Sequence, residues 1–136
     1  MYYHISHVNY LAVLVATLAS FVLGGWWYSP SGFGRAWLAA IGKSMNDLGS
    51  PAVAMTLTVL TTFFTAIILG VLINALGDPT LYRGARLGLI LGVGIVATSM
   101  FSDYLFSGNP LELFLIQAGY RVVLLTIMGG IIVVWG

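Results

Sequence analysis

The sequence contains no cysteine and very few charged residues. Of 136 residues, five are Lys or Arg and four are Asp or Glu, whereas about a quarter of a soluble domain is charged. The absence of cysteine excludes a disulfide framework, a thiolate metal site and a cysteine nucleophile. A net charge of +1 provides no basic face, so we expect no nucleic-acid partner. So few charges cannot cover a globule of this length, which excludes an ordinary water-soluble domain.

Apolar residues make up 60% of the chain and form four long stretches. These stretches span residues 8–28, 52–76, 87–106 and 113–135. About 20 apolar residues in a helix cross a bilayer core of about 30 Å. The stretches are continuous rather than alternating, which favours helices over barrel strands. We therefore predict an all-α integral membrane four-helix bundle that forms a single domain over residues 1–136, with the lipid bilayer as its first partner.

The connectors between these stretches are rich in Gly, Pro and Ser, which are typical turn residues. The first connector is the longest, and within it residues 33–41 are predicted to form a short interfacial helix, because Phe33, Trp37 and Ile41 fall on one side. Four crossings put both termini on one side of the membrane, which we call side A; side B holds the first and third connectors.

Orientation in the membrane cannot be derived from the basic residues. Arg83 and Arg86 lie near side A, and Arg35 and Lys43 lie near side B. The excess of Lys and Arg that marks the cytoplasmic side is therefore equal on both sides, and the orientation stays open.

Small residues recur at intervals of four in three of the predicted helices, including Thr62, Ala66 and Gly70 of the second, a spacing that lets membrane helices approach closely. The first helix has Ala12, Ala16, Ser20 and Gly24, and the third has Gly84, Gly88 and Gly92. We predict that the rows of the first and third helices are helix-packing faces. The sequence leaves open whether the glycine row packs within one chain or makes a contact between subunits.

Polar residues within the membrane gather in the side B half. The side A half is almost wholly apolar apart from Asn74, so a pore through the whole membrane is not expected. We predict a blind vestibule that opens to side B and binds a lipid headgroup, a small anion or ordered water. Its predicted lining is Thr61, Thr65, Ser99, Asp103, Gln117, Tyr120 and Arg121, capped by Trp26 and Tyr28.

Asp103 and Arg121 are the two charged residues inside this cluster. Arg121 lies about 12 Å into the predicted fourth helix, and Asp103 lies about 5 Å from the side B end of the third. An unpaired Arg at the bilayer centre costs about 2.5–3.5 kcal/mol on insertion scales, and its side chain tilts back towards side B. We predict an interhelical ion pair; a site for an anionic ligand or a proton, and snorkelling to lipid phosphate, remain as alternatives.

No motif of a catalytic or metal-binding site is present. The chain has no GxSxG, HExxH, phosphate-loop or dinucleotide fingerprint. His4 and His7 are three residues apart, but no third ligand lies near them. We therefore expect no metal, no cofactor and no enzymatic activity.

Several short motifs resemble a bacterial family known as domain of unknown function 1761. The motifs are Asn9–Leu14, Leu23–Pro30 with Phe33–Trp37, and Gln117–Arg121 with Ile127–Ile131. The family positions that match are Asn9, Trp27, Tyr28, Ser29, Pro30, Gly119 and Tyr120. The resemblance implies a small four-helix protein of a bacterial inner membrane and no established activity. It also implies that Gly119 brings the fourth helix close to a neighbour and that Tyr120 donates into the polar cluster.

Three classes of function remain compatible with the sequence. A structural or accessory membrane subunit, either a homo-oligomer or part of a larger complex, is favoured by the close-packing faces and small connectors. A small carrier or channel for an anionic or lipid-like molecule is the alternative, favoured by the polar cluster. A membrane enzyme acting on a lipid-like substrate is least favoured, because only Asp103, Tyr104, Tyr120 and Arg121 offer reactive groups.

Overall fold

The computed structural model describes residues 9–42, 52–77 and 80–135. The described elements are α2 (Tyr10–Trp27), α3 (Gly34–Ile41), α4 (Ala52–Asn74), α5 (Leu81–Leu91), η2 (Gly92–Ala97), α6 (Thr98–Ser107) and α7 (Leu111–Trp135). Within these ranges there is no strand, and four helices are long and apolar enough to cross a membrane. The predicted all-α architecture with a short helix after the first crossing is confirmed. His4, His7 and Lys43 lie outside the described residues.

Capping residues explain where two of the crossings begin. The Asn9 side chain accepts hydrogen bonds from the backbone N–H of Leu11 at 3.0 Å and so starts α2. Thr80 caps α5 in the same way by accepting from the N–H of Arg83 at 3.2 Å. The third crossing therefore begins at Leu81, earlier than the apolar stretch from Leu87. The predicted stretch began too late because Arg83 and Arg86 lower the hydropathy of the first turns of α5.

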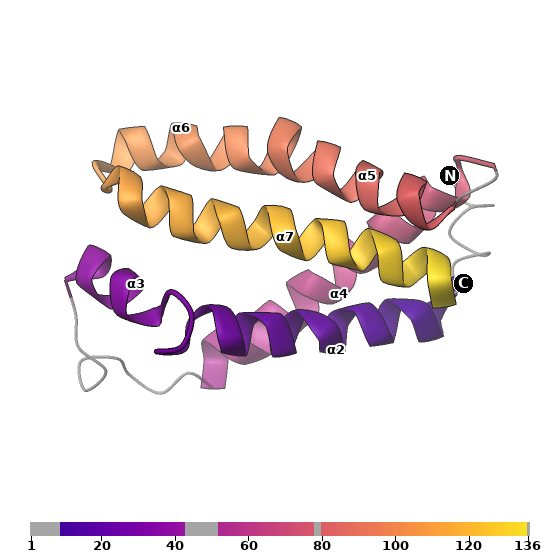
Figure 1. The fold of residues 1–136 in the computed structure, drawn as a ribbon, viewed down its shortest axis with the longest axis horizontal. Coiled ribbons are helices and arrows are strands. Elements are labelled where there is room, and N and C mark those ends of the chain that lie inside the picture. The colour runs from indigo at the N-terminus through magenta and orange to yellow at the C-terminus, as the bar shows by residue number, and fades with distance from the viewer. Residues whose placement is uncertain (1–8, 43–51, 78–79, 136) are drawn as a thin grey trace.

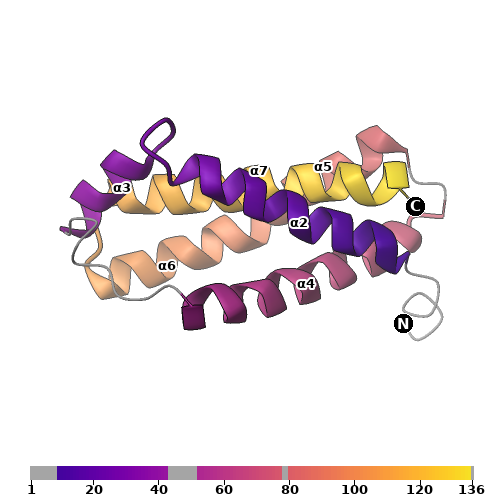
Figure 2. The same ribbon diagram turned by 90° about the horizontal axis from the view of Figure 1, so that it is seen from below.

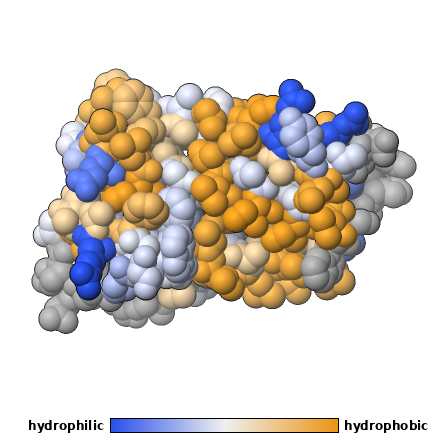
Figure 3. All heavy atoms as spheres, in the orientation of Figure 1, coloured by the Kyte–Doolittle hydropathy of each residue, from blue (hydrophilic) through white to orange (hydrophobic). Residues whose placement is uncertain are grey.

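The bundle is built around α7, which contacts every other described element. α5, η2 and α6 form one long rod along α7, and α2 lies on another side of α7 (Figures 1 and 2). α2 begins and α7 ends at the same end of the molecule, whereas α3 and the α6–α7 turn lie at the opposite end. These two ends are sides A and B. Figure 3 shows hydrophobic side chains over the middle of the molecule and the most hydrophilic ones near its two ends.

The predicted glycine row of the third crossing faces α7 within the same chain. Gly84, Gly88 and Gly92 are all buried. A Cβ atom on Gly88 would overlap the backbone carbonyl of Leu125, and one on Gly92 would lie 3.0 Å from the Cα of Val122. The two backbones are therefore in direct contact, as small residues at this spacing permit. We call this contact the glycine interface.

The rod of the third crossing changes its helical geometry at η2, a π-helical segment. The wider turn is supported by Thr98, whose Oγ1 donates to the carbonyls of Gly94 at 2.9 Å and Ile95 at 3.0 Å. A π segment changes which face the following helix presents. α6 has no buried residue, so its polar side chains stay on the surface of the chain.

Candidate functional site

Five aromatic rings from α2, α3, α7 and the intervening turn meet at side B. Trp27 lies against Phe33 with ring centroids 4.7 Å apart, and Tyr28 lies edge-on to Trp37 at 5.3 Å. Tyr120 joins the two pairs, at 6.1 Å from Trp27 and 5.5 Å from Tyr28. These distances and tilts are favourable for aromatic pairs. We call this group the aromatic cluster.

Two hydrogen bonds fix the aromatic cluster to the backbone. The indole Nε1 of Trp27 donates to the carbonyl of Ile116 at 3.0 Å. The hydroxyl of Tyr120 donates to the carbonyl of Ser20 at 3.1 Å. Each bond joins α2 to α7. Gly119 lies beside the Trp27 ring, and a Cβ there would be 3.4 Å from it, at van der Waals contact.

The turn between α2 and α3 places two rings of the cluster. The N–H of Phe33 donates to the carbonyl of Trp27 at 2.6 Å, and the N–H of Gly34 donates to that of Ser29 at 2.9 Å. A Cβ on Gly32 or on Gly34 would overlap the backbone carbonyls of this turn. The Ser-Pro and Gly residues therefore reverse the chain tightly enough to return Phe33 to the Trp27 ring.

Tyr28 lies just beyond α2 and has an altered acidity. Burial raises the pKa of its hydroxyl to about 12, although the positive charge of Arg121 opposes part of this rise. The hydroxyl consequently stays protonated at physiological pH. Tyr28 acts in the cluster as a neutral aromatic side chain rather than as an acid or a base.

The structure separates the residues of the predicted vestibule. Thr65 and Arg121 line one cavity of about 190 Å³ together with apolar side chains of η2 and α7. Thr61, Ser99 and Asp103 are exposed on the surface of the chain, and Gln117 is half-buried. Tyr28 and Tyr120 meet each other in the aromatic cluster. The structure thus does not bring these side chains together around one vestibule within the described chain.

The predicted cap at Trp26 is wrong, and the neighbouring Trp27 takes the inward position. The Trp26 side chain is 52% exposed, and its ring lies edge-on to Trp27 with centroids 6.2 Å apart. Successive residues of a helix point about 100° apart, so only one of the two tryptophans faces α7. Trp27 does so because its indole N–H reaches a backbone carbonyl.

The predicted ion pair between Asp103 and Arg121 is not formed within the described chain. Both side chains are exposed, and Asp103 makes no polar contact with a described residue. The guanidinium carbon of Arg121 instead lies 5.6 Å from the ring centroid of Tyr120, a cation–π distance. α6 presents Phe101 and Tyr104 to α7, where both rings pack on Phe114 at 5.1 and 5.7 Å. This rotation of α6 leaves Asp103 outside the helix contact.

Two threonine hydroxyls of α4 form hydrogen bonds with backbone carbonyls of the same helix. Thr61 donates its hydroxyl to the carbonyl of Thr58 at 3.0 Å, and Thr65 donates to that of Thr61 at 2.9 Å. Such bonds to the preceding turn are common for Thr in helices. Among the described residues, no buried side-chain polar atom lacks a hydrogen-bond partner. The hydroxyls of these threonines therefore do not require a ligand.

The described residues contain no group of three or more His, Asp or Glu side chains arranged to hold a metal ion. Four helices long and apolar enough to cross a membrane, three of them packed around α7, indicate an integral membrane protein. The chain belongs to the family whose model is described as "Protein of unknown function (DUF1761)", which matches residues 11–133. The matched range includes the turn motif Trp27–Pro30 and the pair Gly119 and Tyr120. No curated protein and no solved structure matches the chain.

Proposed function

We propose that this protein is a non-catalytic structural subunit that associates with a second copy of itself in the membrane. The contact is the polar surface, which consists of Thr61, Thr65, Ser99, Asp103, Gln117 and Arg121. The observation that carries the proposal is the exposure of Asp103 and Arg121 without an ion pair between them. Helical crossings, rather than the barrels of outer membranes, support a place in a bacterial inner membrane.

The depth of the two charges makes their exposure costly. Asp103 lies four residues before the end of α6, about 6 Å along the helix. Arg121 lies ten residues into α7, about 15 Å along the helix. Charged side chains at membrane depth cost about 2.5–3.5 kcal/mol each on insertion scales and normally face a partner or a water-filled cavity. Lipid chains offer neither.

A second copy supplies the missing partners by symmetry. Each chain carries one exposed Asp and one exposed Arg on this surface, so a two-fold axis along the membrane normal forms two reciprocal pairs. The Arg121 side chain tilts towards the start of α7 and therefore towards the level of Asp103. The charges cancel across the contact, and the arrangement needs no third protein.

The neighbouring surface leaves room for another chain. α6 buries none of its residues, and α4 is not in substantial contact with it. Large apolar side chains adjoin this region, including Phe64 at 66% exposed and Phe106 at 93% exposed. Apolar packing around a few charge-assisted hydrogen bonds is typical of helix association in membranes.

The mass of the purified protein in mild detergent tests the proposal. We expect the wild-type chain to elute as a dimer and both Asp103→Asn and Arg121→Gln to elute as monomers that remain folded. Glu112→Gln is the matched control, because Glu112 is an exposed acid at the start of α7 outside the polar surface. A wild-type monomer would exclude self-association and favour an accessory subunit of a complex with other proteins.

A further inference from the structure

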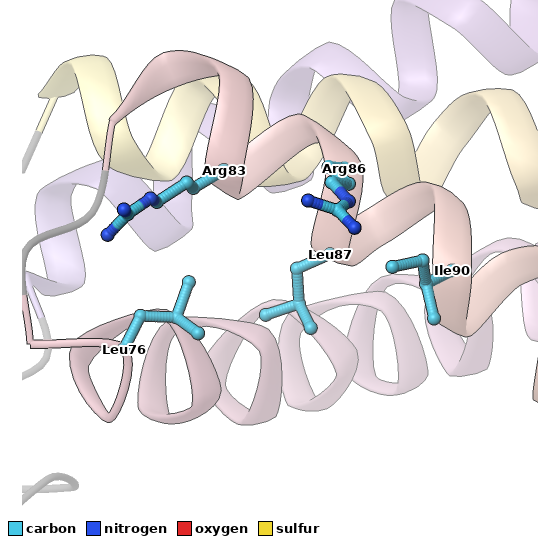
Figure 4. A pocket seen from close by; sticks show the side chains of 5 residues that line it. All are labelled: Leu76, Arg83, Arg86, Leu87 and Ile90. Carbon is cyan, nitrogen blue, oxygen red and sulfur yellow. The ribbon is translucent and has the colours of Figure 1, made fainter.

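A pocket lined by two arginines lies between α4 and α5 near side A, at the opposite end from the polar surface. It has a volume of about 270 Å³ and is lined by Leu76, Arg83, Arg86, Leu87 and Ile90. Both arginines come from α5 and lie over the space between α5 and α4, with Leu76 on the α4 side (Figure 4). The Arg83 side chain extends towards the start of α5, whereas the Arg86 guanidinium lies above Leu87. We call this the arginine pocket.

A second cavity, an apolar groove between α4 and the third crossing, lies one helical turn from the arginine pocket. Leu72 and Leu91 line this cavity, of about 440 Å³, and they lie one helical turn from Leu76 and Leu87 respectively. The lining of that cavity ends at Thr65 and Val96, which also line the 190 Å³ cavity. A hollow thus follows α4 from Leu76 to Thr65. It exists because α4 packs chiefly on α2 and touches α5 only lightly.

The dimensions and charge of this hollow match one class of molecule. From Leu76 to Thr65 the helix rises about 16 Å, which is close to one leaflet of a hydrocarbon core of about 30 Å. Arg83 and Arg86 lie within the first two turns of α5, the level of a lipid headgroup. Guanidinium groups bind phosphate through paired hydrogen bonds.

We propose that this groove binds an anionic phospholipid of the side A leaflet. Its phosphate lies between Arg83 and Arg86, and one acyl chain lies along the groove against Ile68, Leu72 and Leu91. A specific site differs from contact with surrounding lipid in that it combines two cations at headgroup level with a groove as long as one leaflet. The site does not depend on self-association, because it lies outside the polar surface.

Thermal melting of the detergent-solubilised chain with added lipid tests this site. We expect dioleoyl phosphatidylglycerol to raise the melting temperature, while dioleoyl phosphatidylcholine and inorganic phosphate leave it nearly unchanged. Each arginine near a membrane surface contributes roughly a fivefold gain in affinity for anionic lipid, so Arg83→Gln with Arg86→Gln should weaken binding about 30-fold. The matched control is Arg35→Gln, an exposed arginine of α3 at the other end, which should bind as wild type does.

A second pair of variants tests the acyl chain without touching a charge. Ile68→Trp fills the groove from a side chain that is 50% exposed, whereas Val22→Trp, at 75% exposed on α2, lies outside it. We expect Ile68→Trp to weaken binding of dioleoyl but not of dihexanoyl phosphatidylglycerol, and Val22→Trp to change neither.

Three results would overturn the proposal. Equal stabilisation by phosphatidylcholine would remove the role of the arginines. Stabilisation by inorganic phosphate alone would show an anion site with no lipid chain. Loss of binding in Arg35→Gln equal to the loss in the double variant would show that net charge, and not the pocket, attracts the lipid.

Discussion

α5 has two neighbours, and it packs against them in opposite ways. Towards α7 it presents Gly84 and Gly88, and the backbones touch. Towards α4 it presents Arg86, Leu87 and Ile90, and a hollow remains. Both faces belong to the same helix and the same depth of membrane. In α5, the small side chains therefore determine which face closes against its neighbour. The face that lacks them leaves a cavity.

The largest expected effect comes from filling the glycine interface. Gly88→Leu places a side chain where the carbonyl of Leu125 lies, so α5 must leave α7. We expect a loss of about 3 kcal/mol or more and abnormal elution in detergent. Gly94→Leu is the matched control on the same crossing, because a Cβ there meets nothing within 4 Å. Equal melting of the two variants would contradict the direct backbone contact.

The aromatic cluster is a second tight helix contact, between α2 and α7. Hydrogen bonds from side chains to the backbone hold it together, whereas glycines form the contact between α5 and α7. Trp27→Phe removes the donor to the Ile116 carbonyl and with it one hydrogen bond between α2 and α7, which should cost about 0.5–1.5 kcal/mol. Trp26→Phe should change the melting temperature little, since that ring is largely exposed. A greater loss at Trp26 than at Trp27 would reverse the assignment of the inward tryptophan.

The interaction between the Trp27 and Tyr120 rings provides a second test of the aromatic cluster. Their ring centroids lie 6.1 Å apart, and both bond to the backbone of a facing helix. A double-mutant cycle with Trp27→Leu and Tyr120→Leu, which removes both rings, should give an interaction energy of about 0.5–1.5 kcal/mol. Strictly additive losses would show that the two rings stabilise the bundle independently.

The smallest expected effect is a change of stability at alkaline pH. The pKa of Tyr28 is raised to about 12 in the folded chain, from an unfolded value of about 10. Its contribution to stability is therefore complete below about pH 10 and is lost as the pH rises towards 12. The fall in melting temperature over this window should be smaller in Tyr28→Phe. An identical pH dependence in both chains would exclude Tyr28 as its source.

The crossings could be predicted because length and continuous hydropathy determine them. The start of the third crossing could not, because Arg83 and Arg86 interrupt the apolar stretch although Thr80 already caps the helix. The turn and glycine motifs, such as Gly32 and Gly88, correctly indicated close approaches of the backbone.

Most of the predicted vestibule could not be derived, because its geometry depends on the rotation of each helix about its own axis. The π segment η2 and the packing of Phe101 and Tyr104 on Phe114 set the rotation of α6. Neither leaves a clear periodic pattern in the sequence. Side chains predicted to line a cavity, including Ser99 and Asp103, therefore lie on the outside.

Mixing two charge variants tests most directly whether the polar surface joins two copies. Asp103→Arg gives this surface two positive charges, and Arg121→Asp gives it two negative charges. We expect each variant alone to elute as a monomer in mild detergent, since like charges meet across the contact, and the two together to elute as a mixed dimer. An ion pair within one chain cannot be restored by mixing. A mixture that stays monomeric, or single variants that dimerise as wild type does, would contradict the account.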